Sequence, residues 1–206
     1  GRIEEIGTTP GGSGTVSSSS SVGDGGAKEE EEEEDTKNGL TWKVTTDAAA
    51  GDEWLSRRLR QLTKAERMVS VEIAMAGRRI HVSKAAAGVA HLHFDEVCAS
   101  ALGAGDYTAL ASVFHTVGLT GVPRMTIERL DLMRRFITFI DVMYEHKVKL
   151  LAAAAEEPAA LFDKGAPGSG AGSQRDEEFA WDRAASRLSE MSSREYVEAT
   201  WRPKSG

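Results

Sequence analysis

The chain has very few cysteines and no long run of apolar residues. Its 206 residues include one cysteine, Cys98, which excludes an internal disulfide and a cysteine-rich zinc site. Its richest apolar stretches, residues 136–140 and 150–155, fall far short of the roughly 18 to 20 apolar residues needed to cross a bilayer. Hydrophobic residues still make up 40% of the chain, enough to bury a core.

The chain also lacks an excess of positive charge. Lys and Arg total 25 against 32 Asp and Glu, which gives a net charge of −7. Residues 1–40 hold three basic and ten acidic groups, while the rest of the chain carries 22 of each sign. This balance gives no support to nucleic-acid binding, which requires a basic face. Because residue 1 is Gly, we expect the natural amino terminus to lie upstream, so no targeting peptide can be read.

The amino-terminal part of the chain has low sequence complexity. Glycines and five consecutive serines, residues 17–21, lead into the acidic run at residues 29–35. Gly and Ser carry little surface to bury and neighbouring carboxylates repel each other, which predicts a disordered insert over residues 10–38. A second loop is expected over residues 166–173.

The remaining sequence predicts an α+β fold, with a small antiparallel sheet followed by a mainly helical bundle. Alternating β-branched residues with a turn near Gly77 predict a hairpin, whereas apolar spacings of three and four predict helices. Strands are expected over residues 40–45, 69–75, 79–82 and 89–94, and helices over 52–67, 96–102, 107–117, 126–151 and from 176 onward.

The sequence contains no complete centre for phosphoryl transfer. Such a centre needs a glycine-rich loop of the form G-x-x-x-x-G-K-[ST], and the nearest text, residues 23–28, lacks this spacing. We also assign no magnesium site to an apolar strand that ends in Asp-Glu.

Two weaker patterns could carry chemistry. His91 and His93 alternate on one strand face and, with His81 and Asp95, could hold a metal, but packed or solvated histidines are the more common reading. Cys98 and His115 could form a nucleophile and base, although Cys98 lies among apolar residues that are typical of packing.

Two adjacent arginines, Arg134 and Arg135, lie inside the longest predicted helix. A guanidinium on a rigid helix can reach a phosphate, while an ion-pair network between Arg134 and Asp141 is the structural alternative. Arg183 and Arg187 on the last predicted helix allow the same two readings, and we assign them no catalytic role.

Several strings follow one another in the order found in one protein family. They are Gly77-Arg78-Arg79, Phe94-Asp95-Glu96-Val97-Cys98, Leu102-Gly103-Ala104-Gly105-Asp106-Tyr107, Phe114-His115-Thr116, Val122-Pro123, Arg134-Arg135-Phe136-Ile137-Thr138-Phe139-Ile140-Asp141, Tyr144-Glu145, Glu178-Phe179-Ala180-Trp181 and Ser186-Arg187-Leu188. Over most of residues 76–197 the chain thus resembles the AFG-one-like AAA+ ATPases, a family with mitochondrial and bacterial members.

The resemblance implies a P-loop ATPase that uses ATP and Mg²⁺, assembles as a ring of identical subunits and acts on protein clients in quality control or remodelling. It implies that this chain is the carboxy-terminal part only, possessing neither Walker motif and inactive by itself. Residues 1–9 are then the tail end of the nucleotide-binding core, and residues 39–206 form the lid and appended region. A mitochondrial location is the family expectation, or a cytoplasmic one in bacteria.

Carried onto this sequence, the family pattern makes Arg134 or Arg135 the candidate lid arginine of the sensor-two type. No cofactor-binding residue or metal ligand is assigned. An alternative from another functional class stays open at this point, in which the chain is a non-catalytic helical adaptor or binding module.

Overall fold

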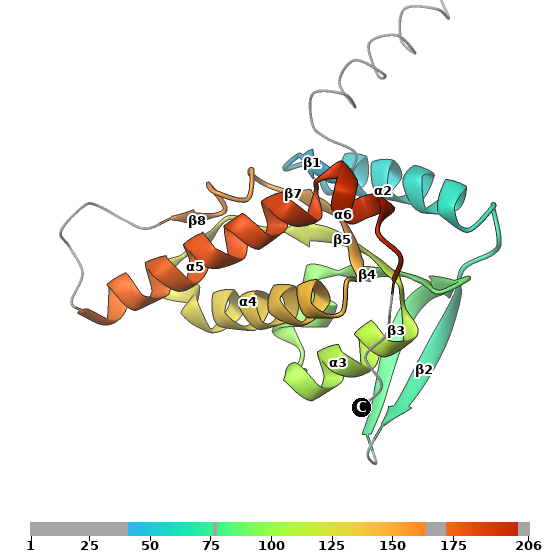
Figure 1. Cartoon of the computed structure of the whole chain (residues 1–206), viewed down its shortest axis with the longest axis horizontal. Coiled ribbons are helices and arrows are strands. Elements are labelled where there is room, and N and C mark those ends of the chain that lie inside the picture. Colours follow the sequence, from blue (N-terminus) through green and yellow to red (C-terminus); the bar gives the residue numbers. More distant parts are fainter. Residues whose placement is uncertain (1–40, 76–77, 164–171, 202–206) are drawn as a thin grey trace, which may run out of the picture.

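A six-stranded mixed sheet forms the centre of the molecule (Figure 1). The computed structural model describes residues 41–75, 78–163 and 172–201, so the expected segments 1–9 and 10–38 and most of the loop at 166–173 lie outside the described residues. The strand order is β1-β7-β5-β4-β3-β2. The bounds are β1 Trp42–Val44, β2 Val69–Met75, β3 Arg78–Ala86, β4 Val89–His93, β5 Thr116–Val122 and β7 Lys149–Ala154.

The expected antiparallel sheet is correct for only one side of this sheet. Strands β2, β3 and β4 form an antiparallel meander, and the hairpin turn falls between Met75 and Arg78 as predicted. The pairs β4–β5, β5–β7 and β7–β1 are parallel. The fold class is therefore α/β with a mixed sheet, not a small antiparallel sheet followed by a helical bundle.

Helices alternate with the parallel strands and cover both faces of the sheet. α3 (Ala104–Val113) connects β4 to β5, and α4 (Leu130–Glu145) connects β5 to β7. Parallel neighbours need such crossover connections. The helix expected over residues 126–151 is thus too long, because α4 ends at Glu145, Lys147 takes a positive φ of 56°, and the chain continues as β7.

Helix α2 (Ala48–Leu62) packs on the other face of the sheet. Its side chains Trp54, Leu55 and Leu59 are buried against the sheet. The expected N-cap, Asp52, is wrong, because Asp47 Oδ1 accepts hydrogen bonds from the backbone N–H groups of Ala49 at 2.9 Å and Ala50 at 3.3 Å. Asp52 lies one turn inside the helix and faces the sheet instead.

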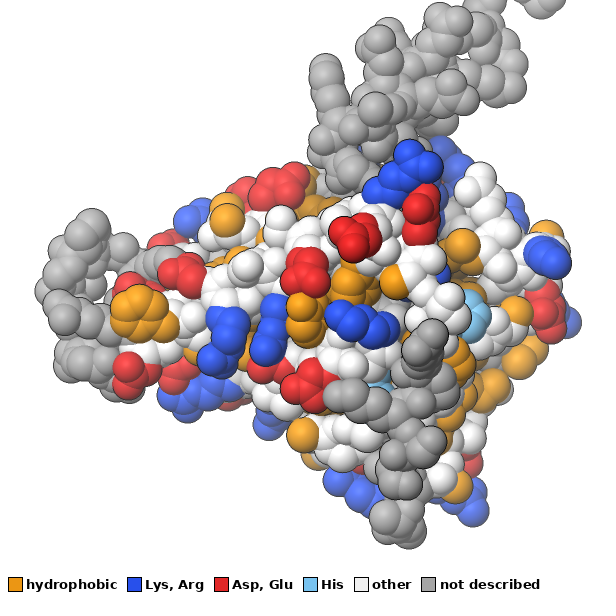
Figure 2. Space-filling view, in the orientation of Figure 1, with side chains coloured by type: hydrophobic (Ala, Val, Ile, Leu, Met, Phe, Trp, Pro, Cys, Tyr) orange, Lys and Arg blue, Asp and Glu red, His pale blue; other side chains and the backbone are white. Residues whose placement is uncertain are grey.

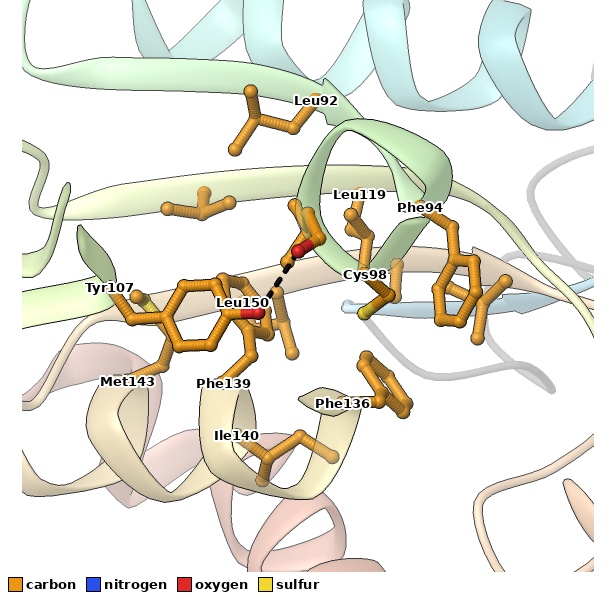
Figure 3. Close-up of a cluster of buried hydrophobic side chains, with 14 of the residues drawn as sticks. Leu92, Phe94, Cys98, Tyr107, Leu119, Phe136, Phe139, Ile140, Met143 and Leu150 are labelled. Atoms are coloured by element: carbon orange, nitrogen blue, oxygen red, sulfur yellow. Dashed lines mark hydrogen bonds between the residues drawn. The ribbon is translucent and has the colours of Figure 1, made fainter. Parts of the chain in front are cut away.

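The main core lies between the sheet and helices α3 and α4 (Figure 3). Phe94 and Phe136 meet edge to face at 5.5 Å between ring centroids, as do Tyr107 and Phe139. These aromatic pairs join the end of β4 and α3 to the buried face of α4, in the geometry that ring quadrupoles favour.

A third helical layer packs on the outside of α4. Helix α5 (Gly172–Met191) buries Trp181, Ala184, Leu188 and Met191 against it, which confirms the predicted apolar stripe. The short helix α6 (Arg194–Glu198) follows. The two-residue strands β6 (Met125–Thr126) and β8 (Phe162–Asp163) pair in a separate ladder. In the described part of the chain, no helix combines the length and apolarity that crossing a membrane would require.

Candidate functional site

Ligands of α/β sheets bind at the carboxyl ends of the parallel strands, and in this chain that edge carries several polar residues after β4. The strand runs directly into Phe94, Asp95 and Glu96, which begin a short π-helix over Asp95–Ala99. His93, the last residue of β4, pairs in register with Thr120 of β5. This edge is the first place in the fold to look for a site.

The side chains at this edge are held in place by local hydrogen bonds. Glu96 Oε2 accepts the backbone N–H of His93 at 2.6 Å, and His93 Nδ1 accepts the backbone N–H of Asp95 at 3.2 Å. The imidazole of His93 lies over Gly121, where a Cβ would stand 2.2 Å from Nε2. These contacts fix the half-exposed imidazole of His93 at the carboxyl end of β4.

The sequence interpretation missed the position of this Asp-Glu pair. Four of the five residues of β4 are buried, and Asp95 and Glu96 follow it after Phe94, so a buried strand does lead into an Asp-Glu pair. The two histidines in Val89–His93 make β4 look only partly apolar, so the sequence did not indicate that the strand is buried. The signal that could have revealed it was Phe94 and Val97, which continue the apolar pattern on either side of the carboxylates.

The predicted histidine cluster is divided between two environments. His91 is buried under α2, with Nε2 3.1 Å from Asp52 Oδ1, whereas His93 is half exposed at the strand end. His81 is exposed on β3, where it pairs in register with Glu72. Among the described residues, no three His, Cys, Asp or Glu side chains converge in a way that could hold a metal ion.

Burial makes His91 sensitive to acid. Loss of hydration, aided by nearby Lys84, lowers the pKa of His91 below its ordinary value, although Asp52 and Glu96 act in the opposite direction. The unfolded chain therefore takes up this proton first as the pH falls. The contribution of His91 to the free energy of unfolding is fully present above the ordinary histidine pKa of about 6.5. It is lost progressively as the pH falls from that value toward the lower pKa of the folded state.

We expect His91→Gln to flatten this pH dependence, because Gln keeps an N–H donor near Asp52 without titrating. Between about pH 7.5 and pH 5.5 the wild-type free energy of unfolding should fall by up to about 1 kcal/mol more than that of the variant. Urea denaturation at both pH values measures the difference. The matched control is His81→Gln on exposed β3, and an equal flattening by both variants would contradict the assignment.

The two candidate lid arginines make protein contacts of different kinds. Arg134, on the exposed side of α4, donates from Nε to Glu177 Oε1 of α5 at 2.8 Å. Arg135 donates from Nη1 to the carbonyl oxygens of Cys98 at 3.0 Å and Ser100 at 2.8 Å. Arg135, which is half buried, therefore accounts for two backbone carbonyls at the end of the π-helix. The helical spacing of the sequence did not predict these contacts.

The other predicted arginine contacts also differ from the expectation. Asp141 pairs with Arg187 of α5 rather than with Arg134, and Arg187 stacks over the ring of Tyr144 at 5.3 Å. These contacts connect α4 to α5, which supports the structural reading of Arg187. Arg183 is exposed on the same helix.

Residues from several of the family-like strings converge on the segment between β4 and α3. Tyr107 donates its hydroxyl to the Val97 carbonyl at 2.9 Å, the dashed bond in Figure 3. Arg78 donates to the Ala101 carbonyl at 3.0 Å and lies 3.1 Å from Asp106, which in turn accepts from the Gly103 N–H. Together with Arg135 of α4, these side chains of β3 and α3 hold the segment between β4 and α3 by hydrogen bonds to its backbone carbonyls. The sequence alone did not predict this network.

The proposed pairing of Cys98 with His115 does not form. Cys98 follows the carboxyl end of β4, while the backbone N–H of His115 bonds to Gly88 beside the amino end of that strand. Both ring nitrogens of His115 are occupied, Nδ1 by the Thr116 hydroxyl at 2.8 Å and Nε2 by the Ala87 carbonyl at 3.0 Å. His115 is thus no base for Cys98.

The thiol of Cys98 should be inert in the folded protein. The side chain is fully buried, and burial raises its pKa to about 12, so almost no thiolate is present at neutral pH. We expect iodoacetamide at about pH 8 to leave Cys98 unmodified in buffer and to modify it completely in urea. Intact mass spectrometry measures this, and rapid labelling in buffer would show that the thiol is accessible.

The sequence of the chain is similar to part of several longer proteins. A family model described as "AFG1-like ATPase" matches residues 33–200. An uncharacterized protein of Schizosaccharomyces pombe, C115.02c, is 34% identical over 144 residues, which cover 61% of this chain and 32% of the relative. Lactation elevated protein 1 homolog B of Danio rerio is 32% identical over 58% of this chain and 28% of its own length.

A bacterial protein is similar over a shorter stretch. Cell division protein ZapE of Escherichia coli K12 is 37% identical over 105 residues, which cover 50% of this chain and 25% of ZapE. The chain therefore spans between a quarter and a third of the length of these curated relatives. No solved structure matches the chain.

Proposed function

Because the chain belongs to the AFG1-like ATPase family, we propose that it is the carboxy-terminal portion of an AAA+ protein that binds and hydrolyses ATP with Mg²⁺. In this proposal the phosphate-binding loop and the Walker B strand lie in another segment of the complete protein. The complete protein uses hydrolysis to remodel protein clients or assist their quality control, and its mitochondrial location is part of the same proposal.

The observation that supports the proposal is the extent of the family match. The matched segment takes in all of the described strands and helices, yet it corresponds to a third or less of the relatives' length. The printed sequence contains no G-x-x-x-x-G-K-[ST] string, and backbone N–H groups in that loop are what hold the phosphates of ATP in P-loop enzymes. We infer that this portion contributes contacts to the core of its own protein or to identical subunits in a ring.

The proposal is tested by ATP turnover of the 206-residue chain beside the protein encoded by its complete transcript. The chain alone should release no phosphate above a protein-free blank, while the complete protein should hydrolyse ATP in a Mg²⁺-dependent way. Turnover by the chain alone would refute the assignment. A complete transcript that starts near Gly1 would instead favour the adaptor function.

A role for Arg135 in nucleotide sensing is part of the proposal, because an arginine on a rigid helix can couple the γ-phosphate to domain position. Arg135→Ala in the complete protein should lower ATP hydrolysis without unfolding it, and Arg134→Ala serves as the surface control. Since Arg135 also binds two carbonyls, thermal unfolding must be recorded on the same samples. Wild-type turnover with unchanged nucleotide affinity would exclude the role.

A further inference from the structure

A pocket lies at the amino ends of the parallel strands, at the opposite end of the sheet from His93 and the Asp-Glu pair. Its walls come from the carboxyl-terminal half of α2, from the residues that begin β5 and β7, and from α6 (Figure 1). Its volume is about 340 Å³, and sites for small molecules range from about 300 to 1,000 Å³. The pocket is therefore large enough for a small organic molecule.

The wall of this pocket carries positive charge. Arg58 of α2 and Lys149 of β7 both line it, and no Asp or Glu is among its described lining residues. Arg58 stacks over Trp54, with 5.8 Å from its Cζ to the ring centroid, which limits the positions of its guanidinium. Lys149 is half buried and forms no ion pair or side-chain hydrogen bond with the described residues. A half-buried cation without a counter-charge attracts an anion.

The positive charge of the pocket is a local feature. Over the face seen in Figure 2, positive and negative side chains are interspersed and form no large patch of either sign. Two carboxylates of the neighbouring helices are paired elsewhere, since Glu53 of α2 pairs with Arg57 and Glu198 of α6 pairs with Arg194. The attraction for an anion is therefore concentrated in the pocket itself.

Two further groups in the lining can donate hydrogen bonds. Thr41, just before β1, has a buried hydroxyl with no hydrogen-bond partner among the described residues. A buried hydroxyl without a partner costs free energy, and an anionic oxygen is an acceptor that would satisfy it. Gln61 supplies an exposed amide. His115 and Thr116 bond to each other, and His115 also bonds to the Ala87 carbonyl, so these two side chains are already occupied.

The rest of the lining is apolar. Leu62 is 51% exposed at the end of α2, while Leu151 is buried and Val197 is half buried. The acidic run of this chain, residues 29–35, matches the charge of the pocket but contains no apolar side chain that could cover these three residues. The lining therefore fits a molecule that has an apolar body as well as an anionic group.

We propose that the pocket binds a small organic anion, whose carboxylate or phosphate group lies between Arg58 and Lys149 and whose apolar body covers Leu62, Leu151 and Val197. Charge-assisted hydrogen bonds from the two cations hold the anionic group. The pocket contains none of the residues on which the proposed function relies, so the failure of either proposal leaves the other unchanged.

Hexanoate is the probe that tests the site, because it joins one carboxylate to a short apolar chain. Titration of the ¹⁵N-labelled 206-residue chain at about pH 7 and 0.15 M salt, followed by NMR, should shift the amide signals of Thr41, Leu62 and Lys149 in a saturable way. We expect a dissociation constant of about 0.1 to 10 mM. Hexyl phosphate carries the same apolar chain, and the tighter of the two anions identifies the anionic group.

Two other probes separate the charge from the apolar body. Acetate lacks the apolar chain and 1-hexanol lacks the charge, so each should bind at least about 5-fold more weakly than hexanoate. An affinity for 1-hexanol equal to that for hexanoate would exclude an anion site. An equal affinity for acetate would exclude the apolar contact.

Three variants with the same change in net charge locate the anionic group. Lys149→Gln should weaken hexanoate binding roughly 5-fold to 30-fold, because it removes a charge-assisted hydrogen bond. Gln61→Glu should weaken it about 3-fold to 10-fold, because it adds a negative charge to the lining. Arg60→Gln changes an exposed residue of α2 outside the lining and should alter the dissociation constant by less than about 2-fold.

Circular dichroism should show that all three variants are folded, so that a change in affinity reports on the pocket. The absence of saturable shifts with either anion, or shifts confined to other parts of the chain, would overturn the proposal. Equal weakening by the three variants would overturn it as well, since it would reflect the net charge of the chain rather than the pocket.

Discussion

Replacing Trp181 with Ala should lower the free energy of unfolding by about 3 to 5 kcal/mol, the range for removing a large buried aromatic side chain. Trp181 is fully buried between α5 and α4. Its ring stacks on Phe136 of α4 at 6.3 Å between centroids and meets the ring of Phe162 of β8 at a tilt, 6.1 Å between centroids. It is therefore the largest side chain that connects the outer helix to the rest of the fold.

The same helix supplies a control for this prediction. Phe179 lies two residues earlier and is 71% exposed, so Phe179→Ala should change stability by no more than about 0.5 kcal/mol. Trp181→Phe should be much milder than Trp181→Ala, because it keeps a ring and removes an indole N–H that has no hydrogen-bond partner among the described residues. Urea denaturation followed by circular dichroism compares the three variants, and equal losses for Trp181→Ala and Phe179→Ala would show that α5 is not docked as described.

Gly118→Ala is the second substitution with a large expected effect, a loss of about 1 to 3 kcal/mol from overpacking. Gly118 lies in β5 directly under α2, and a Cβ there would stand 2.7 Å from Leu59 Cδ1 and 3.0 Å from both Leu55 methyl groups. Both leucines are fully buried, so their methyl groups have little room to move. The helix must shift away from the sheet, or the leucines must take poorer rotamers.

Two further variants identify the cause. Gly105→Ala in α3 meets no atom within 4 Å and should stabilise the chain by up to about 1 kcal/mol through helix propensity. The loss caused by Gly118→Ala should shrink in a Leu59→Ala background, because the nearest clashing atom, Leu59 Cδ1, is gone. Urea denaturation of the wild type, Gly118→Ala, Leu59→Ala and the double variant gives the coupling energy between positions 59 and 118. Strictly additive losses would exclude contact with Leu59 as the reason.

The sequence predicted the elements in which the spacing of apolar residues matches the face that is buried. The β2 and β3 hairpin and the apolar stripe of α5 follow from alternation or helical spacing, because one face of each is more buried than the other. The strand at β4 was also predicted, although four of its five residues are buried. Family strings identified the protein class, but the contacts of their residues appear only in the fold. Arg135, for example, donates to two backbone carbonyls, and its role toward a phosphate stays a prediction.

The sequence could not predict the parallel strands β5 and β7 because their composition favours other structures. β5 contains Gly118 and Gly121, and β7 is mostly Leu and Ala, residues with high helix propensity. Both strands are covered on two faces, so no alternation of polar and apolar residues remains. Their small residues leave room for α2 on one face, a reason that exists only once the helix and the sheet are packed.

The pairing of β1 with β7 has a consequence for the order of assembly. Trp42 pairs in register with Ala152, so the first described strand closes the sheet only after the last central strand has been made. During synthesis the meander of β2, β3 and β4 can form from neighbouring residues, while β1 and the apolar face of α2 wait for β7. Contacts between such distant residues slow folding, and we expect the amino-terminal strand and helix to be the part of this chain most exposed to aggregation or chaperone capture on the ribosome.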